Sequence, residues 1–187
     1  MQVEKPTPPI GPHSKMRQVL ENFPGARRAL FRRYHIGGCS SCGFELDETL
    51  EQLCARNQQL DVAEVLNHIQ NSHVQDEKIW IAPSELAQQL NLNAQQRPKL
   101  VDIRTREEFE ATHIDGTQLM TQELMQQMLG GWSREQPFVI IDHQGRQALD
   151  AAAYFLGHGF QNVRALRGGI DAWSLQVDPK MPRYRLG

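Results

Sequence analysis

The chain has 187 residues, which is long enough for one large domain or for a small domain followed by a medium one. Its 20 basic and 22 acidic residues nearly cancel and are spread over both halves, so a nucleic-acid partner or an anionic membrane surface has no electrostatic support. No stretch approaches the ~18–20 apolar residues of a membrane span, and the N-terminus lacks the apolar segment of a secretory signal.

A helical pattern fills the first 70 residues. Residues 1–13 hold four prolines and few large apolar side chains, which indicates a flexible leader. From there the apolar spacing predicts short helices, interrupted at Pro24-Gly25, with Asp47 as the expected N-cap of the third helix and Cys54 on its apolar face. These helices are expected at residues 16–23, 26–34, 48–57 and 61–70. We therefore expect a small all-α domain over residues 14–70.

A pair of cysteines lies in the central loop of this helical stretch, as Cys39-Ser-Ser-Cys42. Two cysteines at this spacing can close a small disulfide ring or offer two thiolates to one metal ion. The pair suits a reducing compartment, so we expect a cytoplasmic protein. A zinc site would need further ligands, for which His35 and Cys54 are the candidates, but the apolar surroundings of Cys54 favour a place in the core.

Strands alternate with helices after the polar segment 71–78, which we interpret as a linker. Apolar runs of strand length occur at residues 78–82, 99–104, 137–142 and 162–168. Helical patterns occur at residues 83–92, 105–113, 121–132, 148–160 and 169–177. Alternation of this kind predicts an α/β fold with a parallel sheet flanked by helices on both faces.

The most distinctive loop of this second half follows the strand 137–142. A buried parallel strand that runs directly into a helix presents backbone N–H groups at the helix N-terminus, which is a ready anion site. A glycine within the loop permits a tight turn that directs the amides inward. The loop consists of Asp142, His143, Gln144, Gly145, Arg146 and Gln147.

Two sequence blocks carry a resemblance to a known family. LVDIRTREEFEATHIDGTQL resembles the rhodanese pattern of a strand ending in Asp-x-Arg, an acidic-aromatic helix and His-Ile-x-Gly, and LRGGIDAW resembles the stretch that closes rhodanese domains. The resemblance covers residues 79–183. It implies a rhodanese-like fold with a Cys-x-x-Gly-x-x loop, whose cysteine carries sulfur as a persulfide. Three residues before Gly145 stands Asp142, so the resemblance implies that classical sulfurtransferase activity is lost, and whether the protein is an enzyme stays open.

The same resemblance and the loop chemistry suggest roles for individual residues. We expect Asp142 to accept hydrogen bonds from the loop amides and to cap the helix, in preference to acting as a nucleophile. We expect His143 to be a surface residue of the loop, and Arg146 to be solvated or to bind a small anionic ligand at the loop mouth. Asp102 and Arg104 form the Asp-x-Arg pair, which we expect to tie the strand end to neighbouring loops. The Gly168-Gly169 turn and Trp173 are expected to serve packing.

A second resemblance concerns the segment SKMRQVLENFPGARRALFRRYHIGGCSSCGFELDETLEQLCARNQQLDVAEVLNHIQ. Its Phe-Pro before the second helix, its Gly-Cys-x-x-Cys turn and its Glu-Thr-Leu-Glu resemble the small helical domains of the DUF1858 type, described as hybrid-cluster-protein-associated redox disulfide domains. The resemblance covers residues 14–70. It implies a redox or metal-linked dithiol, with an iron–sulfur cluster or zinc as possible cofactors at Cys39 and Cys42.

These observations lead to a functional hypothesis with three alternatives. The leading hypothesis is a cytoplasmic accessory protein of sulfur or thiol-redox metabolism, in which Cys39 and Cys42 do the chemistry and the degenerate rhodanese-like domain binds a protein partner or an anionic ligand. The alternatives are a non-enzymatic scaffold, a metal or iron–sulfur carrier, and a sulfurtransferase that uses Cys39 or Cys42. We expect neither a nucleic-acid nor a membrane partner.

Overall fold

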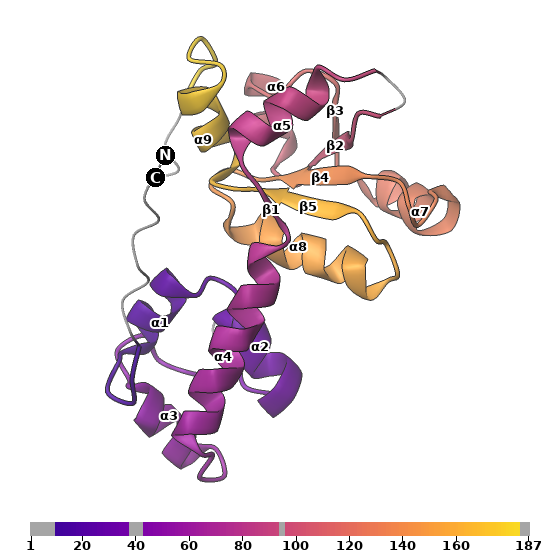
Figure 1. The fold of residues 1–187 in the computed structure, drawn as a ribbon. Coiled ribbons are helices and arrows are strands. Elements are labelled where there is room, and N and C mark those ends of the chain that lie inside the picture. The colour runs from indigo at the N-terminus through magenta and orange to yellow at the C-terminus, as the bar shows by residue number, and fades with distance from the viewer. Residues whose placement is uncertain (1–9, 38–42, 94–95, 184–187) are drawn as a thin grey trace. The chain divides into compact units, whose positions relative to one another are not determined.

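The computed structural model describes residues 10–37, 43–93 and 96–183, and the chain divides into two compact units, residues 1–78 and 79–187 (Figure 1). The first unit has one hydrophobic core cluster and the second unit has two. Within the described ranges, none of the helices combines the length and the apolar character needed to cross a membrane.

The first unit is built from helices, as the sequence predicts. Its elements are α1 (Met16–Asn22), α2 (Ala26–Tyr34), α3 (Leu50–Arg56) and α4 (Val62–Glu77). The apolar stripes of these helices converge on one buried cluster, which includes Met16, Val19, Leu30, Leu50, Leu53, Cys54, Val65 and Ile69. The expectation that Cys54 is a core residue is confirmed, since its side chain is buried and burial raises the pKa of its thiol.

Two expectations about this unit need correction. Residues 71–77, expected as part of a linker, continue α4, because Asp76 is buried and forms an ion pair with Arg28 of α2. The third helix is capped by Thr49 instead of Asp47: the Thr49 hydroxyl accepts the N–H of Gln52 at 3.2 Å, and the Gln52 side chain accepts the N–H of Thr49. This reciprocal capping box satisfies two backbone donors, whereas Asp47 lies farther from the helix start.

The second unit is a parallel sheet covered by helices. Its strands are β1 (Trp80–Ile81), β2 (Lys99–Asp102), β3 (Thr117–Leu119), β4 (Phe138–Ile141) and β5 (Val163–Leu166), in the order β1-β5-β4-β2-β3. Every pairing between these strands is parallel. Its helices are α5 (Pro83–Leu90), α6 (Arg106–Ala111), α7 (Gln122–Gly131), α8 (Arg146–Gly157) and α9 (Gly169–Gln176). The predicted α/β class is therefore confirmed.

The central strand β4 separates two apolar cores. Its four residues are all buried, and successive side chains point to opposite faces. Phe138 and Ile140 belong to a cluster with side chains of α7 and α8, whereas Val139 and Ile141 belong to a cluster with side chains of α5 and α9. A strand buried on both faces explains the unbroken apolar run FVII in the sequence.

Two features of this unit differ from the sequence-based expectation. The short edge strand β3, which pairs with β2 from Leu100↔Thr117 to Asp102↔Leu119, was not predicted. Helix α8 begins at Arg146, two residues earlier than expected, because Gly145 takes a left-handed conformation (φ 84°) and forms its N-cap.

Candidate functional site

The loop after β4 lies at the carboxyl edge of the sheet, where binding and catalytic groups of open α/β sheets gather. β4 ends at Ile141 and α8 begins at Arg146, so four residues make the turn. β4 is also the central strand of the sheet, with β5 on one side and β2 on the other. The turn therefore starts from a central strand that is buried along its whole length.

The carboxylate of Asp142 fills the space enclosed by the loop amides. One of its oxygens accepts a short hydrogen bond from the N–H of Gly145. The other accepts the N–H groups of Gln147 at 2.7 Å and Ala148 at 3.2 Å. Asp142 is only 4% exposed. The hydrogen bonds expected of Asp142 are present, and the anion position at the start of α8 is occupied by the chain's own carboxylate.

Close packing of a second turn fixes the shape of this loop. A Cβ atom on Gly145 would lie 2.8 Å from the backbone N of Gly168, and one on Gly169 would lie 2.5 Å from the carbonyl oxygens of Asp142 and His143. Both carbonyl groups accept hydrogen bonds from the first turn of α9, at 2.9 Å and 3.1 Å. Gly168 and Gly169, the glycine pair predicted to serve packing, therefore pack directly against the backbone of the loop, on the side of β5.

The expectation that His143 is a surface residue is wrong. The sequence indicates a surface residue, but His143 is only 8% exposed. His143 lies beside Ile170, Ser174 and Arg183, which are distant in sequence, so no local pattern reveals its burial. His143 nevertheless contributes to the wall of a cavity.

A cavity of about 290 Å³, lined by several polar and charged side chains, opens in front of the loop. Arg146 lies on its wall and is exposed, in agreement with the expected place at the loop mouth. Asp142, Gln144 and Gln147 line the cavity from the loop, whereas Arg104 lines it from the end of β2. Every predicted loop residue except Gly145 therefore borders one space.

Two further lining residues, Thr105 and Glu108, were missed by the sequence analysis. They form the capping box of α6, in which the Thr105 hydroxyl accepts the N–H of Glu108 and the Glu108 carboxylate accepts the N–H of Thr105 at 3.0 Å. The signal that could have found them is the Thr-x-x-Glu pattern, which marks a helix start.

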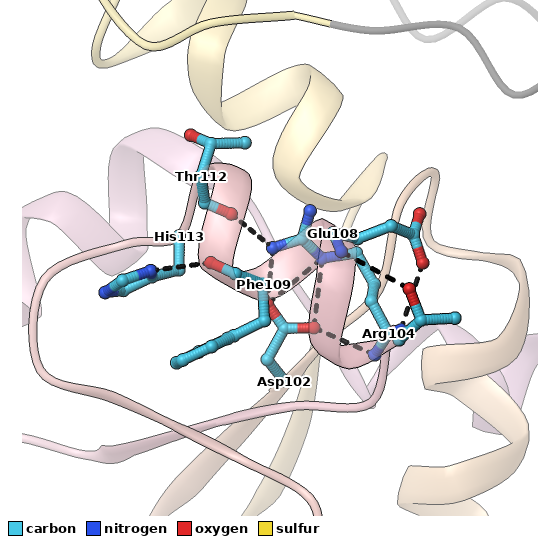
Figure 2. Close-up of polar contacts among 7 residues, drawn as sticks. Asp102, Arg104, Glu108, Phe109, Thr112 and His113 are labelled. Carbon is cyan, nitrogen blue, oxygen red and sulfur yellow. Dashed lines mark hydrogen bonds and ion pairs between the residues drawn. The ribbon is translucent and has the colours of Figure 1, made fainter.

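The Asp-x-Arg pair forms a buried network beside this cavity (Figure 2). The guanidinium of Arg104 donates to both carboxylate oxygens of Asp102, with Nη2–Oδ2 at 2.7 Å and Nε–Oδ1 at 3.0 Å. Its Nη2 also donates to the carbonyl oxygen of Thr112 at 2.7 Å. These bonds join the end of β2 to the end of α6. The structural role expected of the pair agrees with this geometry, since the charge of Arg104 is committed to Asp102.

The dithiol residues Cys39 and Cys42 lie outside the described residues. The chain on both sides of them is described: Gly37 and Gly43 have φ values of 82° and 109°. A Cβ atom on Gly43 would overlap the backbone of Gly37, so the two glycines are in direct contact. Arg56 holds this contact from α3, because its Nη2 donates to the carbonyl oxygen of Gly43 and to Glu48 at 2.7 Å.

The possible cofactors suggested by the sequence also concern Cys39 and Cys42. Across the parts of the chain that the structure describes, no group of three or more His, Cys, Asp or Glu side chains could hold a metal ion. His35 ends α2 in a left-handed conformation, and Cys54 is buried in the core of the helical unit. Of the two candidates for further zinc ligands, His35 therefore lies at the end of a helix, whereas Cys54 lies in the hydrophobic core.

The fold and the loop together define a class of protein: a parallel α/β domain whose central strand leads into an amide-lined anion loop. Residues 82–176 match the sequence family described as Rhodanese-like domain. The chain belongs to this family. The resemblance of the second half to rhodanese domains is thereby confirmed.

Several known proteins are similar to the second half of the chain. The thiosulfate sulfurtransferase GlpE of Pseudomonas putida (strain GB-1) is 31% identical over 86 residues, which covers 46% of this chain and 78% of that protein. The enzyme of the same name from Pseudomonas aeruginosa (strain LESB58) is 34% identical over 93 residues, which covers 50% of this chain and 81% of that protein. A rhodanese-like domain protein from Staphylococcus aureus, of known crystal structure, is 22% identical and covers 56% of this chain and 97% of its own, with a TM-score of 0.45.

Proposed function

We propose that this protein is a cytoplasmic accessory protein of sulfur or thiol-redox metabolism. In this proposal the rhodanese-like domain binds a partner protein or a small ligand without transferring sulfur. The dithiol of Cys39 and Cys42 carries the covalent chemistry. The observation that carries the proposal is the Asp142 carboxylate within the amide loop.

Asp142 stands where the resemblance to rhodaneses places the persulfide-forming cysteine, three residues before Gly145. A carboxylate cannot hold a transferable sulfane sulfur, and the chain has no cysteine beyond Cys54. The loop amides that would cradle a substrate anion already bind the Asp142 carboxylate. Sulfur transfer at this loop therefore lacks both its nucleophile and its empty anion site.

In this proposal a ligand binds in the cavity in front of the loop. Arg146 is exposed on its wall, whereas Arg104 is engaged by Asp102. The cavity also carries the carboxylates of Glu108 and Asp142. A small anionic ligand would therefore interact chiefly with Arg146, at the mouth, and a protein partner could cover the same opening.

The assignment of covalent chemistry to Cys39 and Cys42 follows from elimination among the three cysteines and from the resemblance of residues 14–70 to redox disulfide domains. Cys54 is buried, and burial raises the pKa of its thiol, which suppresses the reactive thiolate. The other two cysteines are the remaining thiols of the chain. A close pair of thiols in a reducing compartment is more often redox-active or metal-binding than structural.

The test is a thiosulfate-to-cyanide sulfur transfer assay on the full chain. We expect no turnover above buffer for the wild type and for the double variant Cys39→Ser/Cys42→Ser. Turnover that survives in the double variant would place a working sulfurtransferase in the rhodanese-like domain and overturn the proposal. The variant Asp142→Cys restores a thiol in the loop, and any gain of activity there would show that the missing nucleophile is the decisive change.

A second measurement addresses the dithiol directly. Anaerobically purified protein is analysed for iron, zinc and bound sulfur, and is then titrated with a series of dithiol redox buffers. A reversible two-electron transition that disappears in Cys39→Ser supports the redox assignment. Bound iron or zinc that is lost in the same variant would replace it with the metal-carrier alternative.

A further inference from the structure

A second and larger cavity, of about 420 Å³, lies at the opposite edge of the sheet. Pro98 and Leu100 line it at the start of β2, and Gly116 lines it directly before β3. Because all strands are parallel, these amino ends lie opposite the carboxyl edge that carries the Asp142 loop. The residues that line the two cavities are different.

Apolar side chains form the floor of this cavity. Leu100, Ile114 and Trp173 are buried members of one core cluster, and Met181 packs against the same cluster. A volume of this size falls within the range of small-molecule sites, whose walls are mainly apolar with a few polar groups. The floor therefore suits the apolar body of a ligand.

Two contacts with Phe109 fix the orientation of the His113 ring. Its Nδ1 lies 2.8 Å from the carbonyl oxygen of Phe109, and its ring stacks on the Phe109 ring at 4.2 Å with an interplanar angle of 11° (Figure 2). A carbonyl oxygen can only accept, so Nδ1 carries the hydrogen, and Nε2 of the neutral ring is an acceptor. The segment that follows α6 and bears His113 is held by the bond from Arg104 to the Thr112 carbonyl.

Charged groups complete the rim. Asp115, Asp178 and Arg97 line the cavity as well, so these three side chains together contribute one net negative charge. The Nε of Arg97 donates to the carbonyl oxygen of Leu92 at 2.6 Å, which anchors the guanidinium to its own loop. The rim therefore carries two carboxylates and one guanidinium, and one oxygen of Asp178 already accepts the N–H of Lys180 at 3.2 Å. An ammonium group, with three donors and no acceptor, complements such a rim.

We propose that this cavity binds a primary ammonium group carried on an apolar body. The apolar body contacts Leu100, Ile114 and Trp173, and the ammonium donates to Asp115 and to Nε2 of His113. This chemistry is shared by small alkylamines and by the free N-terminal residue of a peptide that starts with an apolar amino acid. The site is independent of the function proposed for the Asp142 loop.

The test is an NMR titration of the full-length ¹⁵N-labelled protein, because the indole N–H of Trp173 reports on the cavity while those of Trp80 and Trp132 serve as internal references. The probes are 3-methylbutan-1-amine and its isosteric alcohol, together with Leu-Gly-Gly and its N-acetylated form. We expect saturable shifts at Trp173 with the amine and with the free peptide. The alcohol and the acetylated peptide should bind at least about tenfold more weakly.

Two single variants test whether the amine binds in this cavity. Asp115→Asn is expected to weaken amine binding by about tenfold. Glu110→Gln is the matched control, because it removes one exposed charge from α6 outside the cavity and should bind like the wild type. Equal binding of amine and alcohol, unchanged binding by Asp115→Asn, or shifts confined to the Asp142 loop would each overturn the proposal. Preference for the amine or for the peptide identifies which source carries the ammonium group.

Discussion

Removal of the Asp142 carboxylate should destabilise the rhodanese-like unit strongly. In Asp142→Ala the amides of Gly145, Gln147 and Ala148 all lose their acceptor. An unsatisfied buried donor costs about 1–3 kcal/mol, and water can reach part of the space that the shorter side chain leaves. We therefore expect a loss of about 2–4 kcal/mol in the free energy of unfolding, and about half as much for Asp142→Asn, which keeps one acceptor oxygen.

Urea unfolding followed by tryptophan fluorescence reports on the stability of the rhodanese-like unit, residues 79–187. The chain has three tryptophans, and Trp80, Trp132 and Trp173 all lie in the second unit. For a denaturant slope of about 1.5 kcal/mol/M, a loss of about 3 kcal/mol lowers the midpoint by about 2 M. The matched control is Glu135→Ala, which removes an exposed carboxylate. A midpoint for Asp142→Ala within about 0.3 M of the control would refute the role assigned to the carboxylate.

Three further predictions concern other polar groups. Arg104→Met leaves the Asp102 carboxylate buried without its cation and should cost about 3–5 kcal/mol in the same fluorescence assay, whereas an equal stability to wild type would contradict the buried ion pair. The hydrogen bond from Arg56 lowers the pKa of the Glu48 carboxyl, so the stabilisation from this ion pair is complete above the unfolded pKa of Glu48 and is lost as the pH falls through the lower folded pKa. In Glu48→Gln, the hydrogen exchange of peptides that contain residues 43–56 should therefore speed up less on acidification than in the wild type. Residues 71–77 are helical, so thermolysin should spare them in wild type and cut them faster in Asp76→Asn; equal cutting would argue against that ion pair as the anchor of α4.

The elements that the sequence predicts well are those with strong local patterns. The four buried residues of β4 form an unbroken apolar run, and Pro83 marks the first turn of α5, so both were predicted at or close to their positions. The three-residue strand β3 carries no such pattern. It pairs only with β2 at the edge of the sheet, and its existence depends on that partner.

Long-range contacts explain the remaining differences. The polar composition of residues 71–77 suggests a linker, but Asp76 meets an arginine 48 positions earlier, and this buried ion pair holds the end of α4. His143 lies against residues 170–183, which are distant in sequence, and Arg104 of the Asp102–Arg104 pair also donates to the carbonyl oxygen of Thr112. Residue types and approximate positions of the loop could be read from the sequence, whereas burial and hydrogen-bond partners required the fold.

The contact between Gly37 and Gly43 has a consequence for protein engineering. Gly37 and Gly43 are in direct contact, and Arg56 is bound to the Gly43 carbonyl. Loop-closure entropy rises by only about 0.6 kcal/mol for each doubling of loop length. Because both ends of the segment between the two glycines are held by that contact, we expect residues inserted between Cys39 and Cys42 to leave the packing of α2 against its neighbours intact, so that the spacing of the two cysteines can be varied separately from the core.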